Sequence, residues 1–231
     1  THNLGVVARF ANRVNVMYSG RIRETGSVDA IFDNPHHPYT VGLLDSIPRF
    51  DEAEREKMRT IEGEIPDPAN RPSGCTFRTR CRWATDECTT LDPQLVPLEE
   101  AHNVACWRSD SVFREPIATA ELTGRSTLAS NGAAAPTETE LKPLIDARDV
   151  KVHFPITSGI VWTRTVGHVK AVDGVSLSIM PGETLGLVGE SGSGKTTFGR
   201  ALLRLIDLTS GDIDFDGDEI SLLKGKEMRR L

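Results

Sequence analysis

The sequence has no apolar run of the roughly 18 residues that a helix needs to cross a lipid bilayer. Its first residues also lack the pattern of a secretory signal, in which a positively charged stretch precedes an apolar one. We therefore expect a cytosolic location, and this expectation is compatible with contact to a membrane protein.

Basic residues are outnumbered by acidic ones. The sequence has 27 Lys and Arg residues and 33 Asp and Glu residues, which gives a formal net charge of −6. A surplus of negative charge repels a phosphate backbone, so we expect no nucleic-acid partner. With 231 residues, of which 38% are hydrophobic, the chain can bury one sizeable core or two small ones.

Large apolar residues are scarce between residues 109 and 141, where Ala, Thr, Ser, Gly and Glu dominate. Such a composition buries too little surface to offset the entropy of ordering the chain. The segment is predicted to be a flexible linker, with one frayed helix near 118–122 as the alternative.

The most informative motif that is present is Gly-Glu-Ser-Gly-Ser-Gly-Lys-Thr at residues 189–196, a complete phosphate-binding loop. An apolar strand at 184–188 precedes it, and an amphipathic helix is predicted from about residue 194 to 206. Backbone N–H groups at such a helix N-terminus point into one concavity, where phosphate oxygens find donors and a favourable dipole. Lys195 is expected to reach the β- and γ-phosphates, and the Thr196 hydroxyl to complete the shell of a Mg²⁺ ion. The predicted nucleotide-binding residues of this loop are Gly189, Glu190, Ser191, Gly192, Ser193, Gly194, Lys195, Thr196 and Thr197.

The elements around the loop alternate between strand and helix, which predicts an α/β fold. Strands are expected at 144–154, 171–179 and 210–217. Together with the loop, three short stretches carry a resemblance to the N-terminal half of an ABC-transporter ATPase domain, namely Ala-Val-Asp-Gly-Val-Ser at 171–176, Pro-Gly-Glu at 181–183 and Ser-Gly-Asp-Ile at 210–213. The resemblance covers residues 142–231 and implies a P-loop NTPase that binds ATP and Mg²⁺.

In that family an aromatic residue of the first strand stacks on adenine, and Phe154 is the matching position. A core position in the β-subdomain is the alternative for Phe154, because residues 155–167 have the pattern of an inserted hairpin. Trp162 in that insertion is the other aromatic candidate.

Residues 1–50 resemble the other end of such a domain. The resemblance starts at His2, which matches the switch histidine, and continues through 13–26 with Ser19 and Gly20 as a hairpin turn. A neutral imidazole there can bond the γ-phosphate and orient the attacking water, so His2 is the predicted catalytic residue. Asn3 departs from the family pattern, in which Asp usually follows this histidine.

Within an ABC domain the phosphate loop precedes the switch histidine, whereas here the order is reversed. We therefore expect two tandem ATPase domains in a longer polypeptide, with His2 and Lys195 in different sites. The sequence contains no Leu-Ser-Gly-Gly-Gln-like stretch, no apolar strand ending in Asp-Glu and no glutamine loop. The full-length protein is thus expected to hydrolyse ATP, and this chain alone to be inactive.

Three further stretches resemble the C-terminal extension of the oligopeptide/dipeptide and nickel importer ATPases. They are Asn-Pro-His-His-Pro-Tyr-Thr at 34–40 with the apolar helix after it, Glu-Gly-Glu-Ile-Pro at 62–66, and the cysteine region within 51–108. The resemblance implies an energy-coupling subunit of a peptide importer, with integral-membrane permease subunits and a separate solute-binding protein as partners. It places the protein peripherally, through the permease, at the cytoplasmic face of the inner membrane. A non-transport ABC ATPase and a metal-binding interaction module are the alternatives, and His36 and His37 are expected to be structural.

All four cysteines, Cys75, Cys81, Cys88 and Cys106, lie in this extension without a CxxC pair. Four clustered thiols in a cytosolic chain favour a metal over disulfides. A [4Fe–4S] cluster, a zinc ion and reduced packing cysteines remain as three alternatives. Arg78, Arg80 and Arg82 flank the sites and are expected to favour the thiolate forms.

Overall fold

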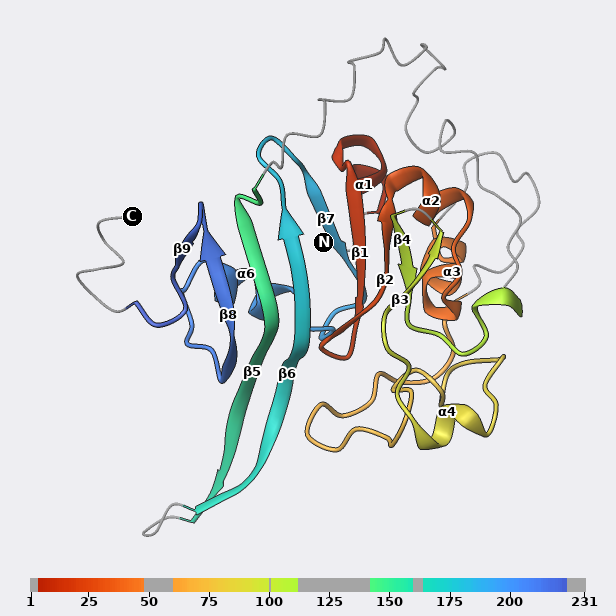
Figure 1. Ribbon diagram of the computed structural model, residues 1–231. Coiled ribbons are helices and arrows are strands. Elements are labelled where there is room, and N and C mark those ends of the chain that lie inside the picture. Colours follow the sequence, from red (N-terminus) through yellow and green to blue (C-terminus); the bar gives the residue numbers. More distant parts are fainter. Residues whose placement is uncertain (1–3, 48–59, 100, 112–141, 160–163, 224–231) are drawn as a thin grey trace.

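The computed structural model describes residues 4–47, 60–99, 101–111, 142–159 and 164–223. They form two β-sheets with helices on and between them (Figure 1). The helices are α1 (Leu4–Phe10), α2 (Val28–Asp33), α3 (Pro38–Asp45), α4 (Glu87–Thr90), the 3₁₀ turn η1 (Ser109–Ser111) and α6 (Lys195–Leu202). The strands are β1 (Arg13–Tyr18), β2 (Arg21–Ser27), β3 (Val96–Glu99), β4 (His102–Val104), β5 (Ile145–Ser158), β6 (Arg164–Ile179), β7 (Leu185–Val188), β8 (Ser210–Phe215) and β9 (Asp218–Glu219).

The first sheet combines strands that are far apart in the sequence, in the order β3-β4-β2-β1-β7. β1 and β2 form an antiparallel hairpin in which Ser19 and Gly20 both have positive φ angles, of 47° and 79°. This is the backbone that a two-residue hairpin turn requires, so the predicted turn is confirmed. β7, the strand before the phosphate loop, pairs in parallel with β1, with Val16 opposite Val188. Residues from both predicted ATPase segments therefore share one sheet (Figure 1).

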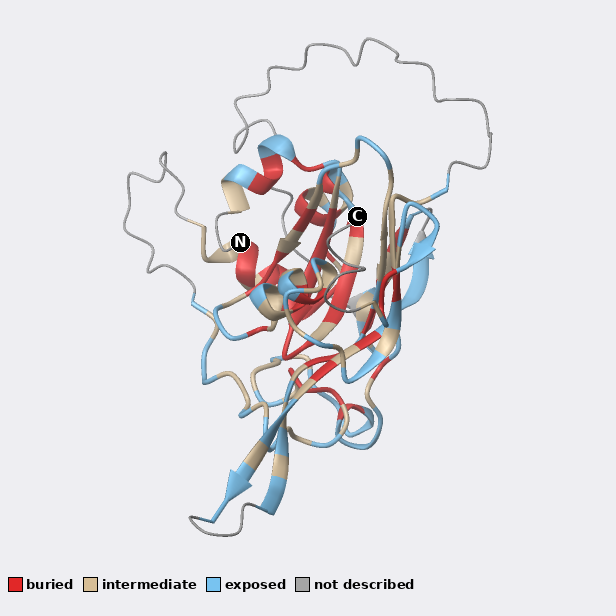
Figure 2. Cartoon of the chain, turned by 90° about the vertical axis from the view of Figure 1, so that its left-hand side faces the viewer, coloured by how far each residue is buried: buried red, intermediate tan, exposed pale blue. Residues whose placement is uncertain are grey.

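The second sheet has the order β6-β5-β8-β9 and is dominated by the long hairpin of β5 and β6. The ladder continues to the pair Ser158 and Arg164, so the predicted inserted hairpin over 155–167 is present as far as the structure describes it. Figure 2 shows that this end of the hairpin projects from the body and is largely exposed, whereas buried residues gather where the two sheets face each other.

Two apolar clusters fill the interior. One packs α1, α2 and α3 against the first sheet through residues such as Val14, Phe32 and Leu44. The other lies between the sheets, where Phe198 of α6 contacts residues of β5, β6 and β8, as well as Met17 at the far side. Because α6 is held from both sides, the loop before it is fixed in position.

The predicted helix after the phosphate loop is shorter than expected. α6 ends at Leu202, and Arg204 has a left-handed backbone with a φ of 53°. A left-handed residue cannot continue a right-handed helix, so the apolar pattern up to residue 206 is used by an irregular segment instead. Among the described residues, none of the helices combines the length and apolarity that a bilayer-spanning segment needs.

Candidate nucleotide-binding site

The phosphate loop lies between β7 and α6, where the sequence predicted it. Gly194 caps the N-terminus of α6 with a φ of 106°. The Gly20 N–H donates to the Ser193 carbonyl at 2.8 Å, so the β1–β2 turn holds the loop from one side. The Asp173 N–H in turn donates to the Gly20 carbonyl at 2.9 Å, which ties the same turn to β6.

Two glycines of the loop are required by close backbone approach. A Cβ at Gly189 would lie against the Met17 carbonyl, and one at Gly194 against the Ala171 carbonyl. Both residues also have positive φ angles, which side chains disfavour. The loop therefore fits between β1 and β6 only with glycine at these positions.

Lys195 is folded back over its own loop. Its Nζ donates to the carbonyls of Gly189, at 2.8 Å, and Glu190, at 2.6 Å, and to the Ser193 hydroxyl at 3.0 Å. Burial lowers the pKa of Lys195 from its ordinary value of 10.5. Because these three acceptors carry no net charge, exchanging them for phosphate oxygens would give the ammonium charge-assisted hydrogen bonds, which suits a polyphosphate ligand.

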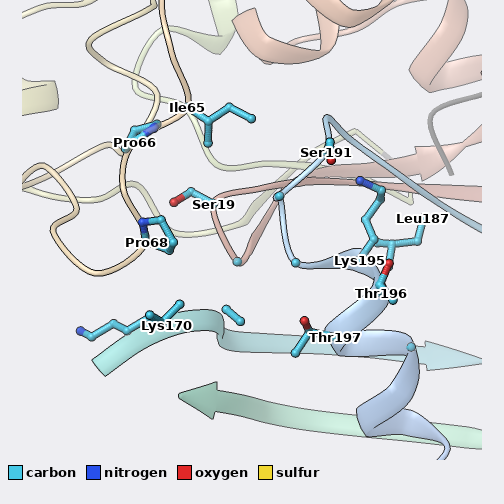
Figure 3. A pocket seen from close by; sticks show the side chains of 16 residues that line it. Ser19, Ile65, Pro66, Pro68, Lys170, Leu187, Ser191, Lys195, Thr196 and Thr197 are labelled. Carbon is cyan, nitrogen blue, oxygen red and sulfur yellow. The ribbon is translucent and has the colours of Figure 1, made fainter. Parts of the chain in front are cut away.

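A cavity of about 640 Å³ opens beside the loop. Its residues come from the loop and α6, from β6, from the β1–β2 turn and from an irregular segment near residue 66 (Figure 3). The lining includes Ser191, Gly192, Gly194, Lys195, Thr196 and Thr197 of the predicted set. Such a volume lies within the usual range of small-ligand pockets, about 300–1,000 Å³.

Phe154 is not part of this lining. It lies on β5 opposite Val169, which does line the cavity, and it is 44% exposed. Its place in adenine stacking stays a prediction. His2 and Trp162 lie outside the described residues, so their predicted roles stay predictions as well.

No pattern in the sequence predicts the contacts that the extension makes with the loop. Arg80, whose side chain is only 3% exposed, binds the Glu190 carboxylate through two nitrogens at 2.7 and 3.0 Å. The Tyr39 hydroxyl accepts a hydrogen bond from the Glu190 N–H at 2.6 Å. Residues more than a hundred positions away thereby fix the second residue of the phosphate loop.

A second charged group binds the β1–β2 hairpin to β6. The Asp173 carboxylate accepts from Arg21 at 2.8 Å, from Arg71 at 2.9 Å and from His153 at 2.9 Å. Its own burial would raise the pKa, but the bonds from Arg21 and His153 outweigh it and hold the pKa of Asp173 at about 2. This carboxylate is therefore ionised throughout the neutral range.

The histidines at 36 and 37 surround a buried carboxyl group. Glu24, fully buried in β2, accepts the backbone N–H of His36 at 2.6 Å and that of His37 at 3.1 Å, and pairs with His102 Nε2 at 2.9 Å. The Nδ1 atom of His37 accepts the Tyr39 N–H at the start of α3. Burial lowers the pKa of His37 to about 3, so this ring is a neutral capping group, in line with the expected structural role.

The four cysteines are free thiols that line one narrow cavity together with Phe77 and Trp83. Within the part of the chain that the structure describes, no three His, Cys, Asp or Glu side chains are arranged to hold a metal ion. Burial raises the pKa of Cys81 to about 11 and that of Cys106 to about 12.

Of the three neighbouring arginines, Arg82 favours the thiolate of Cys81, but burial outweighs its charge and raises the pKa of that thiol to about 11. Arg78 donates to the Ser73 carbonyl, Arg80 binds Glu190, and Arg82 stacks on the Trp83 ring. The turns of this segment engage these guanidinium groups with other partners, and burial is the largest cause that raises the pKa of Cys75, Cys81 and Cys106.

A parallel strand, a glycine-rich loop ending in Lys-Thr and a helix define a P-loop nucleotide-binding protein with mixed α/β sheets. Residues 172–231 match the family model "ABC transporter", and residues 23–88 match "Oligopeptide/dipeptide transporter, C-terminal region". The chain is therefore related to the ATPases of oligopeptide/dipeptide ABC importers, which confirms the predicted resemblance. The order of the two matched segments is consistent with a tandem-domain protein.

Relatives with similar sequences are named as transport proteins. The oligopeptide transport ATP-binding protein OppD of Mycobacterium tuberculosis is 40% identical over 237 residues, which cover 100% of this chain and 37% of that protein. The glutathione import ATP-binding protein GsiA of Salmonella typhi is 33% identical over 231 residues, which cover 100% of this chain and 28% of that protein. The chain thus spans about a third of the length of these relatives.

Proposed function

We propose that this chain is part of the ATP-binding, energy-coupling subunit of an ABC importer for peptides or related small solutes. The observation that carries the proposal is the complete phosphate loop between β7 and α6, which lines a ligand-sized cavity. Peptide and glutathione import in the names of the relatives supports transport over a non-transport ABC ATPase. In the full-length protein, ATP binding would draw two ATPase domains together and hydrolysis would reopen them.

The ligand set for ATP and Mg²⁺ fits the loop. Gly192, Gly194, Lys195 and Thr196 line the cavity, so backbone N–H groups and the Lys195 ammonium would serve as donors for phosphate, and Thr196 would offer its hydroxyl to the metal ion. The bound Mg²⁺ would neutralise charge between the β- and γ-phosphates. The other contribution of the loop at this end of the cavity is to position the phosphates.

The division of the chain stays part of the proposal. Residues 1–50 would end a first ATPase domain, 51–108 would be its extension, 109–141 the linker, and 142–231 the first half of a second domain. Membrane permease subunits would be the direct partners, a separate solute-binding protein would deliver the solute, and the protein would act at the cytoplasmic face of the inner membrane. The transport functions in the names of the relatives support the membrane permease partners.

The first test is binding without turnover. We expect the chain to bind one Mg-ATP weakly and to release no phosphate above the buffer rate, because the sequence holds no catalytic carboxylate or partner motif to stabilise transition-state charge. Calorimetric titration measures the binding, and a phosphate-release assay the turnover. Steady-state hydrolysis that Lys195→Ala abolishes would contradict this expectation.

We further propose that the four thiols of the extension hold a metal centre, either a [4Fe–4S] cluster or a zinc ion. The observation that supports this proposal is that all four thiols line one cavity.

The second test uses anaerobically purified protein. A cluster gives a brown colour and iron in elemental analysis, whereas a zinc ion gives zinc in elemental analysis and no colour, because its d shell is full. Cys81→Ser should remove the metal and expose residues 60–108 to protease, while Thr79→Ala at an exposed position of the same segment should leave both unchanged. If the protein contains neither iron nor zinc, and Cys81→Ser does not alter its proteolysis, the four cysteines are ordinary packing residues.

A further inference from the structure

The cavity beside the phosphate loop has two chemically different ends. One end is formed by Ser191, Lys195 and Thr196, with the backbone N–H groups and the ammonium that phosphates bind. The opposite end is mostly apolar, and Lys170 is its charged member; the apolar residues that form it are Ile65, Pro66, Pro68, Val169 and Ala171. Figure 3 shows the Pro66 and Pro68 rings across the cavity from Ser191, Lys195 and Thr196, with the Lys170 side chain directed away from Lys195.

The segment that carries the two prolines is fastened to β6. The Lys170 N–H donates to the Pro68 carbonyl at 3.2 Å, and Arg71 bonds both the Lys170 carbonyl and the Asp173 carboxylate. The Asp67 side chain accepts the Ala69 N–H at 2.8 Å, which closes a turn directly after Pro66. The segment is therefore attached to the strand that forms the rest of the apolar end.

Two prolines in three residues also stiffen this wall. Each pyrrolidine ring fixes its own φ angle, and both rings are half-buried at the cavity surface. A wall that is already ordered loses little entropy when a ligand arrives, so its contacts contribute almost fully to affinity.

We propose that Pro66 and Pro68 form the wall against which the base and ribose of the bound nucleotide pack. The inference rests on the proposed nucleotide binding at the phosphate loop. With the phosphates held at Lys195, the nucleoside is the part of the ligand left to fill the apolar end. Proline rings and the side chain of Val169 offer faces but no donors or acceptors, so the wall binds a base without reading its edges.

The test compares a ligand with a nucleoside to one without it. The double variant Pro66→Ala/Pro68→Ala of the full chain should bind Mg-ATP and Mg-GTP each about tenfold more weakly, because the nucleoside loses part of its apolar contact. Binding of Mg-tripolyphosphate, which has no nucleoside, should change less than about twofold and also reports that the variant is folded. Pro72→Ala is the matched control, since this proline lies in the same segment but does not line the cavity.

Titration calorimetry separates the outcomes. If the double variant loses equal affinity for Mg-ATP and Mg-tripolyphosphate, or loses affinity for neither, the two prolines do not form a wall for the nucleoside. The phosphate loop would remain the binding site in both cases. A parent chain that binds neither Mg-ATP nor Mg-tripolyphosphate would overturn the proposed function and this inference together.

Discussion

Lys195→Ala is expected to weaken Mg-ATP binding by this chain roughly a hundredfold. The lysine supplies charge-assisted hydrogen bonds to phosphate, each worth about 1.5–3 kcal/mol, and about 2.7 kcal/mol is a hundredfold in affinity. Its three present acceptors are two carbonyls and a hydroxyl of its own loop, which solvent can replace. The fold should therefore tolerate the substitution, and the loss should appear in affinity rather than in stability.

Arg200→Ala is the control for this result, because it removes the same charge from the exposed side of the same helix. It should change affinity less than about threefold through the general electrostatic field. In the longer tandem polypeptide, Lys195→Ala should remove one of two bound nucleotides and leave the other. Loss of both nucleotides at once would argue against two separate sites.

Glu24→Ala is expected to lower the free energy of unfolding by about 3–5 kcal/mol. The substitution leaves the His36 and His37 backbone N–H groups and the His102 ring without their partner in a fully buried place. Each unsatisfied buried donor costs about 1–3 kcal/mol. Because these groups fix the entry to α3, and Tyr39 of α3 bonds the phosphate loop, the damage should reach the nucleotide site as well.

Urea denaturation measures this change. Glu62→Ala removes an exposed carboxylate of the extension and should alter stability by no more than about 0.5 kcal/mol. Glu24→Gln keeps the shape but replaces one acceptor oxygen by a donor, so its effect should lie between the two. A Glu24→Ala protein within about 1 kcal/mol of the parent would show that the surrounding donors find other partners.

Local patterns in the sequence were enough to find the phosphate loop and the elements next to it. A glycine-rich loop has to follow a strand and open a helix for its N–H groups to converge, so spacing alone located residues 189–196. The turn at Ser19 and Gly20 and the start of α3 at Pro38 follow from equally local constraints on φ. The expected length of α6 was wrong because an apolar period continues past the left-handed Arg204.

The contacts between distant segments were decided only by the tertiary structure. No residue of β1 indicates that β7, about 170 positions later, is its parallel neighbour, since parallel pairing leaves no turn between the strands. Arg80 was predicted to serve the thiols next to it in sequence, yet it binds Glu190, because a turn-rich segment sets side-chain direction independently of sequence neighbourhood. The sequence alone determined the chemistry of the phosphate end of the site. The packing of the extension against β6 determined what the other end offers, because that surface exists only once both segments are folded together.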